Sequence, residues 1–113
     1  MSVNKTDMNY GEVISDVLSY ISDESNFMLS NQFLNKKIVA VFRDEELMST
    51  ADSFFKSDLN ISETSKNTFM HRNTLIYRIQ KIHKVTGLNL RTVKDAVTFI
   101  TLKAIYDKIC NTK

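Results

Sequence analysis

The chain has 113 residues, of which 42% are hydrophobic and 25% charged, and this balance excludes a disordered protein and indicates one folded domain. It contains no proline and only two glycines, so it lacks the turn residues that β-sandwiches and barrels need, and an all-α fold is predicted. The net charge of +2 combines an acidic half, residues 1–64, with a basic half, residues 65–113, which suggests an anionic partner or, more simply, a solvated basic face.

The N-terminal third predicts two helices joined by a polar connection. Residues 1–9 are polar, and an apolar stripe of helical spacing follows over residues 11–22. After the connection at residues 22–26, apolar residues at helical spacing favour a second helix over residues 30–42. The run KKIVAVF at its end could also form a buried strand, but the sequence offers no convincing partner strand, so we favour the helix.

A third helix is predicted over residues 43–58. Asp44, Glu45 and Glu46 lie in its first turn, where the helix dipole favours negative charge. These acids could be interpreted as a catalytic cluster, but no nucleophile or histidine accompanies them in a recognisable motif. The preference of helix starts for acids explains them better.

Next, the sequence predicts a short helix, a tight turn and a longer helix. Asn60 and Glu63 form a candidate N-cap and capping box for a helix over residues 61–67. A turn through residues 68–70 then leads into a basic helix over residues 71–85. Together these elements follow the helix-turn-helix plan, in which the second helix lies in the major groove of DNA and reads base edges.

The basic helix has the two faces that this plan requires. Leu75, Ile79 and Ile82 share one face and predict contact with the neighbouring helices, and Gly87 is placed to end the helix as a C-cap. Arginine and asparagine can make bidentate contacts to guanine and adenine, a threonine methyl can touch a thymine methyl, and basic side chains reach phosphates. The outward and flanking candidates for contact with double-stranded DNA are Arg72, Asn73, Thr74, Tyr77, Arg78, Lys81 and Lys84.

The stretch SETSKNTFMHRNTLIYRIQKIHKVTGLNL resembles the helix-turn-helix at the C-terminus of PucR-type regulators, which include sugar-diacid regulators. The similarity rests on the run HRNTL at residues 71–75, on YRI at residues 77–79 and on Gly87, and it covers about residues 46–109. The start of the helix is also similar to that of Fis-type proteins. The resemblance implies that His71 begins the recognition helix, that Arg72, Asn73 and Thr74 enter the groove, and that Tyr77 and Arg78 continue the contact.

Some features depart from the family pattern. Ser65 stands where the family usually has alanine, Thr68 where it usually has leucine, and Phe69 at a turn position that many helix-turn-helix proteins give to glycine. Thr68 is expected to weaken the apolar seam by about 1 kcal/mol or more, whereas Ser65 is small enough for close helix packing. Family members generally carry a long N-terminal sensory region, and only residues 1–45 precede the similarity here, so ligand sensing is not inferred.

The last helix, predicted over residues 91–109, carries two apolar faces. One consists of Val93, Val97, Ile100 and Ala104, and the opposite one of Phe99, Leu102, Ile105, Tyr106 and Ile109. Because covering a helix-turn-helix core needs a single stripe, the second should pack on the N-terminal helix or on another copy of the chain. We therefore predict a homodimer, with residues 1–44 as a helical extension for packing or dimerisation and residues 45–110 as the DNA-binding domain.

Other classes of function find no support in the sequence. No nucleophile–base pair, phosphate loop or metal-ligand spacing is present, so no enzymatic activity, cofactor or metal is predicted. His71 and His83 are not expected to share a metal ion, because they would lie about 18 Å apart on one helix. Cys110 is the single cysteine, and the chain contains neither a membrane-spanning apolar run nor a signal peptide, so a cytoplasmic location is expected. The alternative function is a protein-interaction or dimerisation module derived from a DNA-binding domain, without an operator of its own.

Overall fold

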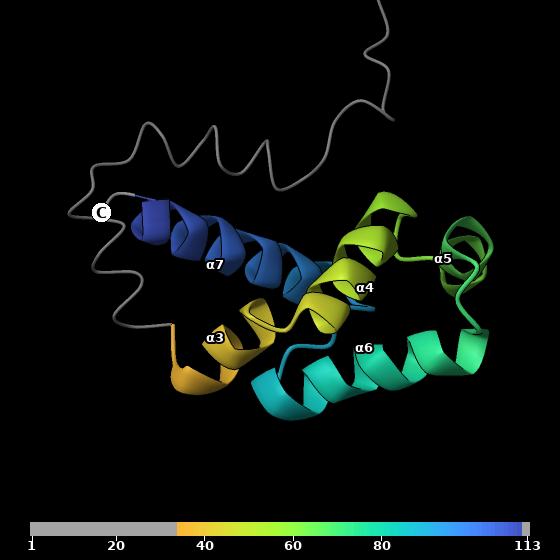
Figure 1. The fold of residues 1–113 in the computed structure, drawn as a ribbon, viewed down its shortest axis with the longest axis horizontal. Helices are drawn as coiled ribbons and strands as arrows, with labels where there is room; N and C mark the ends of the chain where they lie inside the picture. The colour runs from red at the N-terminus through yellow and green to blue at the C-terminus, as the bar shows by residue number, and fades with distance from the viewer. Residues whose placement is uncertain (1–33, 112–113) are drawn as a thin grey trace, which may run out of the picture.

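The computed structural model describes residues 34–111, which form five α-helices and no strand within that range. The helices are α3 (Lys36–Phe42), α4 (Glu45–Lys56), α5 (Ile61–Thr68), α6 (Arg72–Thr86) and α7 (Val93–Asn111) (Figure 1). For these residues the predicted all-α fold is confirmed, and the run KKIVAVF is helical. The helix predicted over residues 11–22 and the connection at residues 22–26 lie outside the described residues.

The arrangement is organised around α4, which contacts α3, α5 and α6. The helix α6 runs along one edge of the molecule, and it contacts α3 and α5 as well as α4 (Figure 1). Three neighbours therefore fix the position of α6, although α3 belongs to the segment that sequence reasoning assigned to an N-terminal extension.

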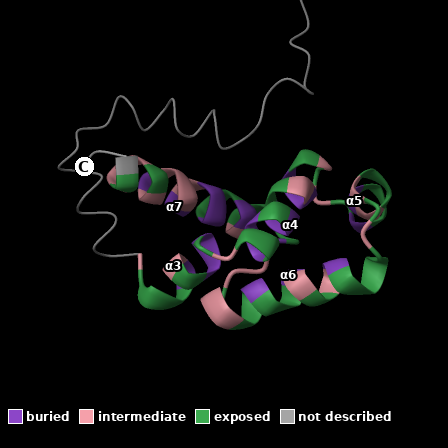
Figure 2. Ribbon diagram, in the orientation of Figure 1, coloured by how far each residue is buried: buried purple, intermediate pink, exposed green. Residues whose placement is uncertain are grey.

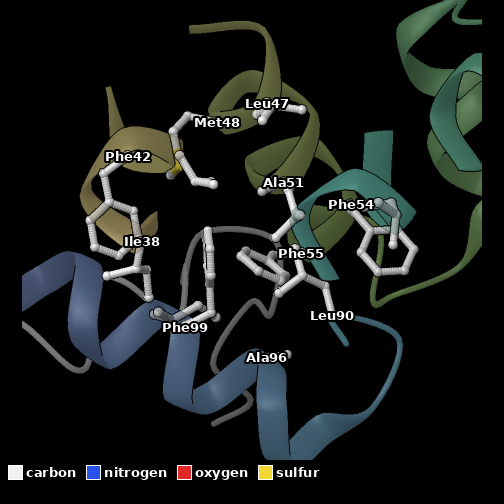
Figure 3. Packing of buried hydrophobic residues seen from close by; sticks show 14 of the residues in the cluster. Ile38, Phe42, Leu47, Met48, Ala51, Phe54, Phe55, Leu90, Ala96 and Phe99 are labelled. Carbon is white, nitrogen blue, oxygen red and sulfur yellow. The ribbon is translucent and has the colours of Figure 1, made fainter. Parts of the chain in front are cut away.

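Aromatic side chains connect α7 to this arrangement. The ring of Phe99 on α7 meets that of Phe42 on α3 edge-on, with 5.3 Å between the ring centroids, and lies 6.0 Å from that of Phe55 on α4 (Figure 3). Phe99 is fully buried. Such aromatic pairs contribute about 0.5–1.5 kcal/mol each beyond the burial of their area. The core is thus continuous from α3 through α4 to α7.

Side-chain caps set the starts of α3 and α4. The Asn35 side chain accepts a hydrogen bond from the Ile38 backbone N–H at 2.9 Å, so α3 begins at Lys36 and not near residue 30 as predicted. The Asp44 carboxylate accepts one from the Leu47 backbone N–H at 3.1 Å. Asp44 is therefore the N-cap of α4 and not part of its first turn, because a capping side chain pairs an N–H that the helix leaves unpaired.

The two predicted faces of the last helix differ in their burial. The face that includes Phe99, Leu102 and Ile105 is buried in the core. The other face is split, because Ile100 is buried whereas Val93 and Val97 are 70% and 48% exposed. The partners expected for an uncovered face, which are the N-terminal helix and another copy of the chain, lie outside the described residues, so this expectation stays a prediction.

The helix α7 starts later than predicted, at Val93 instead of residue 91. The preceding residues form a turn in which the Arg91 backbone N–H donates to the Asn89 side chain at 3.1 Å and the Thr92 backbone N–H donates to the Asn89 carbonyl at 3.0 Å. The Thr92 hydroxyl then accepts from the Asp95 backbone N–H at 3.3 Å. These polar contacts keep residues 89–92 in a turn, so α7 begins only at Val93.

Candidate nucleic-acid interface

The first helix of the predicted helix-turn-helix, α5, begins where its N-cap predicts. The Asn60 side chain accepts a hydrogen bond from the Glu63 backbone N–H at 2.9 Å. Among the described residues the Glu63 side chain makes no return bond to Asn60, so the cap is single and the predicted capping box is only half formed. The buried Thr64 hydroxyl donates to the Asn60 carbonyl at 2.6 Å, which adds a second link within the first turn.

Hydroxyl groups fix the turn between α5 and α6. The Ser65 hydroxyl donates to the Met70 carbonyl at 2.6 Å. The Thr68 hydroxyl donates to the Thr64 carbonyl at 2.7 Å and accepts from the Met70 backbone N–H at 3.2 Å. Two of the departures from the family pattern, Ser65 and Thr68, thus bond the backbone of the turn. Sequence reasoning missed this role because it treated Thr68 only as a lost apolar contact.

The second helix, α6, begins at Arg72, because His71 is its N-cap and not its first residue. The imidazole Nδ1 of His71 accepts a hydrogen bond from the Asn73 backbone N–H at 3.0 Å. At the other end Gly87 has φ +81°, a left-handed conformation that suits glycine, and its N–H donates to the His83 carbonyl at 2.8 Å. The predicted C-cap is confirmed.

The inward face of α6 is the one that the sequence predicts. Leu75 and Ile82 are fully buried and Ile79 nearly so, and all three belong to the main apolar core. In Figure 2 the buried positions of α6 lie on the side toward the other helices, and exposed positions occupy the side away from them. Burying each such side chain contributes about 1.5–3 kcal/mol, so the inward face holds α6 firmly in place.

The outward face of α6 carries most of the predicted contact residues. His71 and Arg72 at its start are exposed, and so are the following side chains: Asn73, Thr74, Tyr77, Lys81 and Lys84. The side chains of these last five make no hydrogen bond to any residue between 34 and 111. The helix contains no acidic residue, so this face offers donors and positive charge to an anion.

The two arginines among the predicted contact residues of α6 are placed differently. Arg72 is exposed, and its Nη1 donates to the Ser62 hydroxyl on α5 at 3.1 Å. Arg78 turns toward α4, where Nη1 donates to the Thr50 hydroxyl at 3.3 Å and Nη2 lies 3.2 Å from a carboxylate oxygen of Glu46. The Arg78 side chain is 24% exposed.

Sequence reasoning missed the partners of these arginines. Glu46 and Arg78 are 32 positions apart, and no local spacing rule links residues on different helices. Thr50 could have indicated such a partner from the sequence, because it is a polar residue next to Ala51 on the apolar face of a predicted helix. A buried hydroxyl needs a partner, and Thr50 is fully buried.

Residues 34–111 contain neither a candidate metal site nor a candidate membrane span. No group of three or more His, Cys, Asp or Glu residues there is placed to hold a metal ion. No helix in that range is both long enough and apolar enough to cross a membrane.

Residues 47–105 match the PucR C-terminal helix-turn-helix domain and make up more than half of the chain. The chain belongs to this family. The matched segment begins in α4, includes the whole of α5 and α6, and ends in α7. The resemblance to PucR-type regulators seen in the HRNTL run is therefore confirmed, and the family is one of transcription regulators that bind DNA through this domain.

Relatives of known name support the same family. The chain is 35% identical over 60 residues to the purine catabolism regulatory protein of Bacillus subtilis (strain 168), an alignment that covers 53% of the chain and 11% of that protein. It is 41% identical over 49 residues to the carbohydrate diacid regulator of Escherichia coli (strain K12), which covers 43% of the chain and 13% of that protein.

A third relative, the uncharacterized protein YsfB of Bacillus subtilis (strain 168), is 35% identical over 68 residues, or 60% of the chain and 18% of that protein. The chain thus spans less than a fifth of the length of these PucR-type relatives. No solved structure matches the chain significantly.

Proposed function

We propose that the chain is a sequence-specific DNA-binding transcriptional regulator that inserts α6 into the major groove as its recognition helix. The observation that carries the proposal is the division of α6 into a face buried in the core and an exposed, acid-free face. A helix held on one side and open on the other is what a major-groove reader requires, because the N-terminal part of its open face must reach base edges.

The exposed residues that the sequence predicts to contact DNA have distinct roles in this proposal. Arg72, Asn73 and Thr74 enter the groove near the N-terminus of the helix, where bidentate and methyl contacts to bases can specify sequence. His71 caps this end of the helix and borders the groove. The residues further along, Tyr77, Lys81 and Lys84, contact the sugar–phosphate backbone.

We further propose that the chain acts as a homodimer in the cytoplasm, where a regulator of this kind meets the chromosome. The exposed valines Val93 and Val97 on α7 support the dimer, because apolar side chains on one helix face favour a covering partner. A two-fold dimer would place two recognition helices at half-sites about 34 Å apart. The named relatives are a purine catabolism regulatory protein and a carbohydrate diacid regulator, which supports a regulatory role.

The same valines favour a second candidate function, a protein-interaction or dimerisation module without an operator. Val93 and Val97 can meet another protein whether or not α6 contacts DNA. The two candidates differ in their dependence on salt, because binding to phosphates releases counterions and contact between apolar surfaces does not.

Fluorescence anisotropy with random duplex DNA at several salt concentrations separates the two functions. A DNA-binding regulator gains affinity as salt falls, with a slope of about −0.9 in log K against log salt for each phosphate neutralised. An interaction module shows no binding at any of these salt concentrations. Selection of bound duplexes from a random pool then tests whether the binding depends on sequence.

A further inference from the structure

We propose that Arg78 is a positioning residue that fixes the recognition helix α6 to α4 and to the turn before α6. In this role Arg78 sets the angle at which Asn73 and its neighbours meet the bases and does not itself contact DNA. The inference rests on the proposed DNA-binding function and assigns Arg78 a role different from the phosphate contact that its sequence position predicts.

The contacts of Arg78 link α6 to two other parts of the fold. Its Nη2 pairs with the Glu46 carboxylate in the first turn of α4 at 3.2 Å, and its Nη1 donates to the Thr50 hydroxyl one turn further along at 3.3 Å. The same Nη1 lies 4.0 Å from the sulfur of Met70, in the turn that leads into α6. One side chain thus connects the recognition helix, its scaffold helix and its entry turn.

The Thr50 contact gives this arrangement its rigidity. The ion pair alone would add little, because the Glu46 side chain is 77% exposed and water screens exposed pairs. Thr50 is fully buried, and its hydroxyl donates to the Glu46 carbonyl at 2.8 Å while accepting from Arg78. The bond to the Glu46 carbonyl therefore fixes the orientation of the Thr50 hydroxyl independently of Arg78. The two terminal nitrogens of the Arg78 guanidinium, Nη1 and Nη2, are thus held at two defined points of α4.

The alternative role, a phosphate contact, fits Arg78 less well than it fits the lysines of α6. Arg78 is mostly covered and its guanidinium is engaged on α4, whereas Lys81 is exposed and makes no hydrogen bond to the described residues. To reach a phosphate, Arg78 would have to leave both Thr50 and Glu46. The planar guanidinium suits the present site, because lysine is a point charge that cannot reproduce a two-pronged contact.

The first test compares Arg78→Met with Lys81→Met, a matched loss of charge on the same helix. Binding to a selected duplex and to random duplex is measured by anisotropy over a salt series. For Arg78→Met we expect the preference for the selected duplex to fall about tenfold with the salt slope unchanged. For Lys81→Met we expect the slope to flatten by about 1 with the preference retained. A slope that flattens for Arg78→Met as it does for Lys81→Met overturns the proposal.

The second test uses Glu46→Gln, where the two roles predict opposite results. Removing a negative charge near DNA should tighten binding by simple electrostatics, and it would do so if Glu46 merely competed with phosphate for Arg78. The positioning role predicts instead that Glu46→Gln lowers the preference for the selected duplex, and that adding it to Arg78→Met causes no further loss. Tighter binding with full preference in Glu46→Gln contradicts the proposal.

The conservative variant Arg78→Lys separates the positioning role of Arg78 from a phosphate contact that needs only its positive charge. A phosphate contact would be nearly restored by lysine, whereas the positioning role predicts that Arg78→Lys regains less than half of the lost preference, on a logarithmic scale. Circular dichroism of each variant confirms helix content at the assay temperature. If the unsubstituted chain binds no duplex, the proposed function fails together with this inference, whereas normal binding with preference in every Arg78 variant rejects the inference alone.

Discussion

At the residue scale, Phe69 is placed at a cost in free energy. It adopts φ +57° and ψ 20° in the turn before the recognition helix, and its side chain is 95% exposed. For a non-glycine residue this left-handed conformation is about 1–2 kcal/mol less stable than the right-handed one. Because the Phe69 ring is exposed, packing does not offset this cost. The hydroxyls of Ser65 and Thr68 hold the turn in this conformation despite the cost.

We therefore expect Phe69→Gly to stabilise the protein by roughly 0.5–1 kcal/mol, the relief of strain being partly offset by the greater entropy of glycine in the unfolded chain. The free energy of unfolding in urea measures the effect. Phe69→Ala is the control, because alanine keeps the strain and should gain little. A glycine variant no more stable than the alanine variant would show that the turn is not strained at this position.

Also at the residue scale, the proposed groove contacts can be separated from the proposed phosphate contacts. Arg72→Ala and Asn73→Ala should each lose about 1–3 kcal/mol of binding to a selected duplex and relax its sequence preference. Lys84→Ala should weaken binding to all duplexes alike and flatten the salt slope by about 1. Anisotropy titrations measure both quantities, and an Arg72→Ala variant that binds the selected duplex as tightly as the parent would place the recognition helix elsewhere.

At the scale of the element, the start of α6 depends on an uncommon cap. His71 accepts from the Asn73 backbone N–H, whereas serine, threonine, aspartate and asparagine are the usual capping residues. His71→Ala should therefore destabilise the protein by about 1 kcal/mol, and His71→Asn should restore that stability. Thermal unfolding followed by circular dichroism provides the comparison, in which equal melting temperatures for the two variants would mean that the cap contributes nothing.

The elements themselves differ in how well the sequence predicts them. The end of α6 at Gly87 and the start of α5 at Asn60 are local events, set by a glycine with positive φ and by a side chain three residues from its partner. Both were predicted. The contacts of Arg78 with Thr50 and Glu46 were not predicted, because they form only when two helices that are distant in the sequence pack at a particular angle.

The start of α3 also differs from the sequence prediction, although by only a few residues. Apolar spacing continues toward residue 30 and predicted a longer helix, but Asn35 caps the chain at Lys36. Spacing identifies which side chains face the core, and it is less informative about where a helix begins, because one polar side chain can decide that point.

At the scale of the whole molecule, the exposed part of α7 bears on assembly. Val93 and Val97 leave part of α7 uncovered by any described residue. We expect light scattering at micromolar concentration to give about twice the monomer mass of 13.0 kDa, and Val97→Glu to shift the chain toward the monomer, since a charge in an apolar interface is costly. A mass that stays near 13.0 kDa as concentration rises would contradict the dimer.

The central claim, that α6 reads the major groove, can be tested with dimethyl sulfate on a selected duplex. This reagent methylates guanine N7, which lies in the major groove, and adenine N3, which lies in the minor groove. We predict that the bound protein protects guanine N7 within the selected site and leaves adenine N3 reactive, and that Arg72→Ala, which removes a guanine contact, removes protection at individual guanines. Protection confined to adenine N3, or unchanged protection in Arg72→Ala, would contradict the placement of α6 in the major groove.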